Sequence, residues 1–101
     1  MARRRSSIYV LGHKMRIKRK PRLFSEEGAE LCGYCDFEKR EIWISMSEKV
    51  DQNATLLHEV LHAILHYSGQ GSVMEMKDEE TLVTALEHGL QPLLGILAVF
   101  D

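Results

Sequence analysis

Hydrophobic residues alternate with polar ones in the first half of this chain and follow a helical spacing after about residue 50. The first alternating stretch covers residues 8 to 17, on both sides of Gly12, and Pro21 follows it. Such a pattern predicts one bent strand or two short strands. The apolar residues expected to face the interior are Ile8, Val10, Met15 and Ile17.

A second stretch predicts a β-hairpin. Residues 31 to 35 and 41 to 46 are rich in apolar and aromatic side chains, and the mostly polar segment 36 to 39 separates them. Because successive side chains of a strand point to opposite faces, alternate residues of the second strand should face the same side. These residues are Ile42, Ile44 and Met46.

Residues 52 to 68 predict a helix that is buried on most of its circumference. Asp51 is a suitable N-cap, because its carboxylate can accept a hydrogen bond from a free N–H of the first turn, and Gly69 is a suitable end. Apolar residues on nearly all sides are typical of a buried helix. Here they are Leu57, Val60, Leu61, Ile64 and Leu65.

A second helix is expected after a loop over residues 69 to 76, with Asp78 as its N-cap. Pro92 should kink this helix or separate it from a short tail at residues 93 to 100, since proline removes a backbone hydrogen bond. The predicted fold class is therefore α+β, with a small antiparallel sheet followed by two helices. The apolar residues of the second helix are Leu82, Val83, Leu86 and Leu90.

The length of 101 residues suits a single domain, which we expect to span residues 1 to 101. Hydrophobic residues make up 45% of the chain and charged residues 28%, which excludes a disordered protein. No apolar run reaches the roughly 20 residues of a membrane-spanning helix, and we find no secretion signal. With only two cysteines, this pattern favours a cytoplasmic protein.

The net charge of −2 conceals a strong asymmetry. Residues 1 to 22 hold nine of the 13 basic residues and no acidic one, so this segment carries +9 and the remainder carries −11. A basic arm of this kind can attract nucleic acid or an acidic protein. The simpler interpretation is a strand with a basic outward face, packed on an acidic body.

The predicted first helix contains His58-Glu59-Val60-Leu61-His62, an H-E-x-x-H motif. Residues four apart lie on one helix face, so both imidazoles can reach one metal ion, with nitrogen-to-metal distances of about 2.0 Å. Glu59 would lie beside the ion, where its carboxylate can take a proton from a water and pass it to a leaving amine. A chance spacing or a structural histidine pair is disfavoured, because buried polar groups need partners.

A catalytic zinc site needs a third protein ligand. His66 lies about 12 Å along the helix axis from His58, too far to reach the same ion, so we expect it to pack against or support the site. Glu80 lies on the same face as the apolar Val83, whereas Glu79 is expected to point toward solvent. The candidates as a set are His66, Glu79, Glu80, Glu87 and His88.

Cys32 and Cys35 form a CxxC pair, a pattern found in redox sites and in thiolate zinc sites. A redox pair needs a helix N-terminus to lower the thiol pKa, and a thiolate zinc site needs a second pair of cysteines. The flanking residues predict a strand, in which these two cysteines face opposite sides. We therefore expect ordinary small side chains in or near the core.

The run from Thr55 to His66, followed by the spaced residues Glu80, Val83 and Leu86, resembles the ImmA/IrrE-type zinc metallopeptidases. It is most similar to their short phage-encoded relatives. The resemblance covers roughly residues 31 to 94.

The resemblance implies that Zn²⁺ is held by His58, His62 and Glu80, with Glu59 as the general base. It also implies a protein or peptide substrate, such as a DNA-binding regulator. The chain departs from the family where many members have glycine in place of Leu61, and where most have a residue smaller than Val83. Manganese, iron or cobalt can occupy the same kinds of ligand.

Two functions remain open from the sequence. The first is zinc-dependent hydrolysis of peptide bonds. An exposed strand at residues 42 to 46 or 15 to 20 can pair with an extended substrate, but an ordinary buried or edge strand is the simpler interpretation of each segment. The second is a non-catalytic module that keeps zinc for folding and binds nucleic acid or an acidic protein through residues 1 to 22. A donor that stabilises the transition state is expected among His88, Tyr34 and Tyr67.

Overall fold

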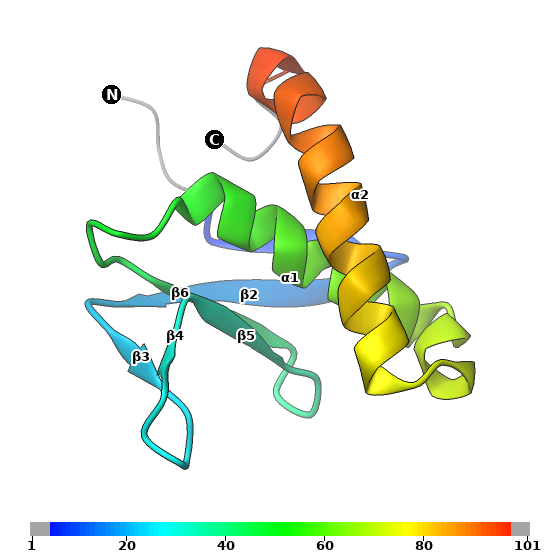
Figure 1. The fold of residues 1–101 in the computed structure, drawn as a ribbon, viewed down its shortest axis with the longest axis horizontal. Helices are drawn as coiled ribbons and strands as arrows, with labels where there is room; N and C mark the ends of the chain where they lie inside the picture. Colours follow the sequence, from blue (N-terminus) through cyan, green and yellow to red (C-terminus); the bar gives the residue numbers. More distant parts are fainter. Residues whose placement is uncertain (1–4, 98–101) are drawn as a thin grey trace.

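A four-stranded sheet and two helices make up the computed structural model, which describes residues 5 to 97 (Figure 1). The predicted α+β class is confirmed. Helix α1 lies along one face of the sheet, and helix α2 crosses α1 on its far side. The strands are β1 (Ser7–Val10), β2 (His13–Lys20), β3 (Leu23–Phe24), β4 (Glu30–Leu31), β5 (Gly33–Asp36) and β6 (Glu41–Ser45).

The alternating stretch around Gly12 forms two strands, β1 and β2, joined by a tight turn. Leu11 and Gly12 both have positive φ, at 49° and 82°. Positive φ at both central residues is the mark of a type I′ turn, whose twist matches that of an antiparallel pair. The described part of the basic segment is therefore mostly strand, while Arg3 and Arg4 lie outside the described residues.

The sheet is mixed, with the order β1-β2-β6-β5, so the expectation of a wholly antiparallel sheet is wrong. β2 and β6 run parallel, and Ile17 lies opposite Ile42. The reason is that β5 and β6 join the sheet as a hairpin whose second strand lies next to β2. Between β2 and β5, the chain reverses direction in the small β3–β4 hairpin, which forms a separate two-stranded sheet.

Two details of the predicted β5–β6 hairpin are also wrong. Leu31 belongs to β4, where it pairs with Leu23, and β5 begins only at Gly33. Met46 lies beyond the end of β6 and is exposed, whereas Ile42 and Ile44 are buried as expected. The pattern of apolar residues marks the faces of a strand, but it does not mark where a strand ends.

Helix α1 (Gln52–Tyr67) covers the inward face of the sheet. Its N-cap is confirmed, because the Asp51 carboxylate accepts a hydrogen bond of 3.0 Å from the N–H of Ala54. A Cβ at Gly33 would lie 2.7 Å from Thr55 Cγ2, so glycine there lets the helix approach β5 closely. The buried core comprises Val10, Met15, Ile17, Ile42, Ile44, Leu56, Val60 and Ala63.

Helix α2 (Met76–Leu97) begins two residues before the predicted N-cap, so Asp78 lies inside the first turn. A short 3₁₀ helix, η1 (Gln70–Val73), occupies part of the expected loop. Pro92 lies within α2 and does not end it, and residues 98 to 100 of the expected tail lie outside the described residues. Among residues 5 to 97, we find no helix with the length and apolar character needed to cross a membrane.

Candidate metal centre

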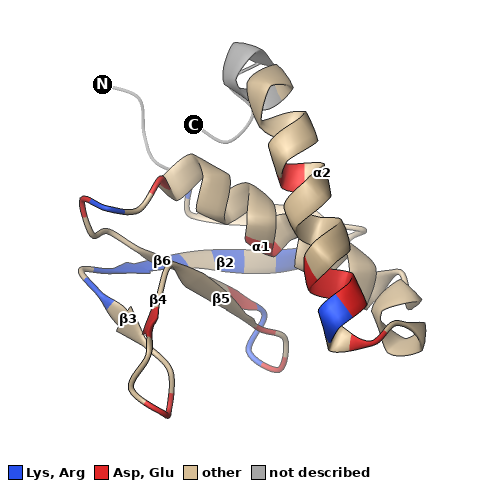
Figure 2. Ribbon diagram, in the orientation of Figure 1, with Lys and Arg blue, Asp and Glu red and all other residues tan. Residues whose placement is uncertain are grey.

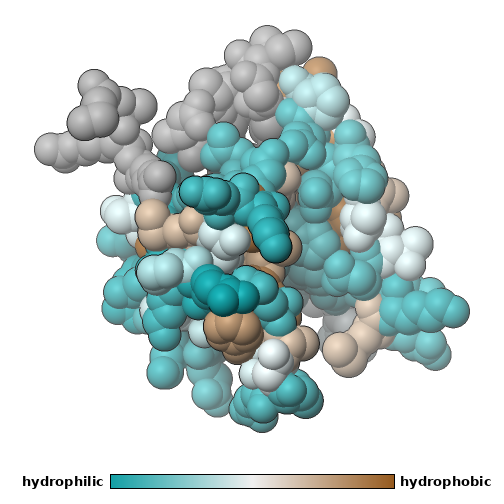
Figure 3. Space-filling model, turned by 60° about the vertical axis from the view of Figure 1, so that its left-hand side comes forward, coloured by the Kyte–Doolittle hydropathy of each residue, from teal (hydrophilic) through white to brown (hydrophobic). Residues whose placement is uncertain are grey.

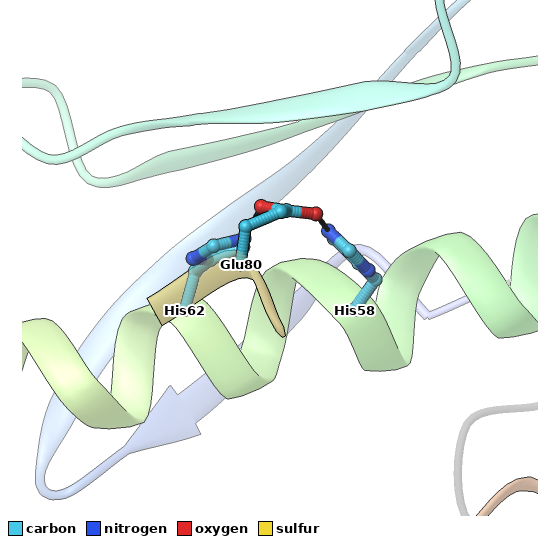
Figure 4. Close-up of side chains that lie close together, drawn as sticks. All are labelled: His58, His62 and Glu80. Carbon is cyan, nitrogen blue, oxygen red and sulfur yellow. Dashed lines mark hydrogen bonds and ion pairs between the residues drawn. The ribbon is translucent and has the colours of Figure 1, made fainter. Parts of the chain in front are cut away.

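The two histidines of the H-E-x-x-H motif converge on one carboxylate (Figure 4). His58 Nε2 lies 2.9 Å from Glu80 Oε1, and His62 Nε2 lies 2.9 Å from Glu80 Oε2. One ligand atom from each of these three residues lies within 4.8 Å of the others. The histidines come from successive turns of α1, and the glutamate reaches across from α2.

Two further carboxylates hold the outer nitrogens of the imidazoles. His58 Nδ1 lies 2.7 Å from Glu87 Oε1, and His62 Nδ1 lies 2.6 Å from Glu79 Oε2. A carboxylate at Nδ1 fixes the proton on that nitrogen and leaves the Nε2 lone pair free, which is the usual arrangement of a metal-bound histidine.

The expectation that Glu79 points toward solvent is wrong. The Glu79 and Glu87 side chains are 24% and 16% exposed, whereas the Glu80 side chain is 56% exposed. Glu79 reaches His62 because it lies four residues before the buried Val83, on the face of α2 that packs on α1. A Cβ at Gly71 would lie 2.8 Å from Glu79 Oε1, so the glycine in η1 leaves room for this carboxylate.

The packing of α2 on α1 explains why three glutamates meet two histidines. Val83 is fully buried, with 0% of its surface exposed, and it packs against Leu57 and Leu61 of α1. Glu79, Glu80 and Glu87 precede or follow Val83 by three or four positions, so all three lie on the helix face that meets α1.

The donor set suits a divalent cation. Each imidazole has a carboxylate at both of its nitrogens, so satisfying both contacts by hydrogen bonds would require both rings to be protonated and charged. A cation between the Nε2 atoms and Glu80 satisfies the inner contacts while both rings stay neutral. The two imidazole nitrogens each lie 2.9 Å from a Glu80 oxygen, and one ligand atom from each residue lies within 4.8 Å of the others, so the three residues are close enough to contact one ion. His58, His62 and Glu80 can therefore hold a metal ion.

Glu59 lies on the buried side of this group and contacts Cys35 of β5. Its Oε1 atom lies 3.4 Å from the Cys35 Sγ atom, within the range of a weak S–H···O hydrogen bond. Burial raises the pKa of Glu59, while the Cys35 hydrogen bond and the nearby His58 and His62 oppose this rise. Burial, together with the Glu59 charge, also raises the pKa of the Cys35 thiol, which therefore stays protonated at neutral pH.

The contact between Cys35 and Glu59 is not apparent from the sequence. The strand prediction places Cys35 and Cys32 on opposite faces, and the structure shows Cys35 partly buried against α1 and Cys32 exposed. Cys35 lies two residues after Gly33, so the two residues are on the same face of β5. Helix α1 covers that face, as the close approach of Thr55 to Gly33 shows.

The remaining candidates lie away from the metal group. His66 stacks on Phe37, with ring centroids 3.8 Å apart, and this agrees with a packing role. Tyr67 stacks on His13 at 4.0 Å, and Tyr34 stacks on Trp43 at 6.3 Å. His88 is exposed on α2. None of these residues joins the described metal group, so a donor for the transition state is not identified among them.

A cleft of about 330 Å³ opens beside His58. His58, Glu59 and Glu87 form its inner end, and Lys49 and Asp51, before α1, lie along its length. The rest of its lining includes Cys32 and Gly33 at the start of β5.

Strand β5 is an edge of the described sheet, whereas both strands proposed to pair with a substrate are internal. β2 lies between β1 and β6, and β6 lies between β2 and β5, so both segments belong to internal strands, which agrees with the simpler interpretation of each. Ser45 N donates to Cys32 O across the β5–β6 pair. Hydrogen bonding alternates along an antiparallel pair, so the backbone groups of Gly33 and Cys35 point outward from the sheet.

Comparisons with known protein families, with curated proteins and with solved structures found no match to this chain. Inferences about its activity therefore rest on the residues of the site and on their geometry.

Proposed function

We propose that this protein is a zinc-dependent metallopeptidase. The observation that carries the proposal is the convergence of His58 Nε2, His62 Nε2 and Glu80 on one point, with a buried carboxylate, Glu59, in the same motif. Two histidines and one carboxylate are a known ligand set for catalytic zinc, and they leave a position for water.

The residues have distinct roles in the proposed reaction. Zinc, when bound, supplies the Lewis acidity that activates water at neutral pH. Glu59 accepts the proton of the attacking water and donates it to the leaving amine, and a pKa raised by burial suits a group that does both. Glu79 and Glu87 hold the imidazoles in place through their Nδ1 atoms.

The proposed substrate is an extended peptide bound along β5. The outward backbone groups of Gly33 and Cys35 can pair with such a peptide as an added strand. The cleft beside His58 and Glu59 can receive a substrate side chain, since its volume of about 330 Å³ exceeds that of any single side chain. A DNA-binding regulator is one such substrate, proposed from the resemblance of the motif residues alone.

The reducing cytoplasm is the compartment that we propose for this reaction. Cys32 and Cys35 are free thiols, and Cys35 contacts the general base, so the arrangement suits an environment that keeps thiols reduced.

The test compares wild type with Glu59→Gln, using Glu38→Gln, an exposed residue of the β5–β6 turn, as the matched control. Each zinc-loaded protein is incubated with a mixture of unstructured peptides, and new peptide termini are counted by mass spectrometry. Wild type and Glu38→Gln should generate new termini, and Glu59→Gln should bind zinc equally but cut at least about 100-fold more slowly. Zinc-loaded wild type that generates no termini, or a Glu59→Gln variant that cuts at the wild-type rate, would contradict the proposal.

A further inference from the structure

The face of the sheet that points away from α1 is basic. Along β2, Met15 and Ile17 point inward and are buried, so the residues between and beside them point outward. Blue segments on β2 mark these basic residues in Figure 2. The outward residues of β2 are Lys14, Arg16, Lys18 and Lys20.

Aromatic rings stand on the same face, next to these cations. Trp43 lies opposite Lys18 in the β2–β6 register and opposite Tyr34 in the β5–β6 register. The Tyr34 and Trp43 rings are 6.3 Å apart and inclined by only 18°, and the Lys20 ammonium lies 5.0 Å from the Trp43 ring centroid. Tyr9, opposite Lys14 at the other side of β2, is 68% exposed. Figure 3 shows the molecule turned by 60° from the view of Figure 1, and on the side seen there hydrophilic side chains surround small apolar areas.

The four outward basic residues of β2 outnumber the two outward acidic residues of the sheet strands, Glu41 and Asp36. Arg16 pairs with Glu41 at 3.1 Å, and Glu41 also accepts a hydrogen bond from Trp43 Nε1. Lys14, Lys18 and Lys20 take part in none of the ion pairs found within residues 5 to 97. A partner of opposite charge that approaches this face therefore meets three ammonium groups that are outside these ion pairs.

We propose that this face binds single-stranded nucleic acid, with phosphates on the lysines and bases stacked on Tyr34 and Trp43. Cations beside aromatic rings on a sheet face that no helix covers are the combination that single strands need, because each base has a flat face to stack and each phosphate a charge to neutralise. An acidic protein would use the charges but leave the paired rings without a matching surface. The face lies on the opposite side of the sheet from α1 and the metal group, so its binding does not depend on the proposed peptidase activity.

The test uses Trp43, the only tryptophan of the chain, as the probe. An oligothymidylate of about 12 nucleotides is titrated into the full-length protein, and Trp43 fluorescence is recorded in parallel with the anisotropy of a dye on the oligonucleotide. Binding should quench Trp43. With three phosphates neutralised, affinity should fall roughly 15- to 20-fold between about 50 and 200 mM salt.

Charge and ring variants separate the two parts of the proposal. Lys18→Glu and Lys20→Glu should each weaken binding and lower the salt slope by about 0.7, whereas Lys77→Glu on α2, with the same charge change, should leave both unchanged. Tyr34→Ala keeps the Trp43 probe and should weaken binding about tenfold.

Three results would overturn the proposal. The first is no binding at about 50 mM salt. The second is binding that Lys18→Glu, Lys20→Glu and Tyr34→Ala leave unchanged. The third is equal binding of polyglutamate, which would identify the face as a site for acidic protein. Melting temperatures of all variants, measured first, ensure that only folded proteins are compared.

Discussion

Replacing Glu87 by glutamine tests whether the carboxylates behind the histidines support the metal. The Glu87 side chain is only 16% exposed, and its Oε1 lies 2.7 Å from His58 Nδ1. Glutamine keeps the shape and an acceptor oxygen but removes the charge that strengthens this hydrogen bond. Loss of such an outer partner weakens metal binding about 10- to 100-fold, or roughly 1.4–2.7 kcal/mol.

Because the glutamine oxygen can still accept from Nδ1, we expect Glu87→Gln to fall near the lower end, at about a tenfold loss of zinc affinity. Glu80→Gln should lose far more, because Glu80 is the third ligand in our assignment. The assay is a competition for zinc between each variant and a chromophoric chelator at constant pH, with Glu38→Gln as the control for an exposed glutamate.

Two outcomes would refute this reasoning. Glu87→Gln with the affinity of Glu38→Gln would mean that the contact at Nδ1 does nothing for the metal. A loss in Glu87→Gln that exceeds the loss in Glu80→Gln would mean that Glu87, rather than Glu80, is the third ligand.

Three other predictions concern stability, measured by urea unfolding. Gly33→Ala should lower the free energy of unfolding by about 1–3 kcal/mol, because the new Cβ would lie 2.7 Å from Thr55 Cγ2. Gly89→Ala is the control and should not destabilise α2, because a Cβ at Gly89 would have no atom within 4 Å. Leu11→Asn should stabilise the protein by up to about 1 kcal/mol, since Leu11 has φ of 49° and asparagine tolerates that conformation better. Burial raises the pKa of Glu59, so its ionised form destabilises the fold and stability falls as pH rises through that pKa. Metal-free Glu59→Gln should therefore be more stable than metal-free wild type at about pH 8, and the difference should vanish toward about pH 4. Equal stability of the two proteins at about pH 8 would count against a buried charge at Glu59.

The local features of the fold were predictable, but the neighbours of each strand were not. Asp51 and the apolar residues after it marked α1, because a helix cap and a helical period are properties of adjacent residues. The parallel pairing of β2 and β6 depends on where the β5–β6 hairpin joins the sheet. Alternating apolar residues indicate which face is buried, and they carry no information about which strand lies alongside.

The residues of the candidate metal group were predictable for the same reason, whereas their supporting partners were not. His58 and His62 are four residues apart, which alone places them on one helix face, and both the stripe shared with Val83 and the resemblance favoured Glu80 as the third residue. The contact of Glu79 with His62, by contrast, depends on how α2 crosses α1. The contact of Cys35 with Glu59 likewise depends on the seating of α1 on β5, which Gly33 permits.

The most direct test of the central claim is a calorimetric titration of zinc into the metal-free protein, compared with the same titration of His58→Ala, Glu80→Ala and Glu79→Ala. If His58, His62 and Glu80 form the site, wild type should bind one zinc per chain, His58→Ala should bind none, and Glu79→Ala should bind it more weakly than wild type but more tightly than Glu80→Ala. Wild type that takes up no zinc, or a His58→Ala variant that binds it with unchanged affinity, would contradict the assignment of this site.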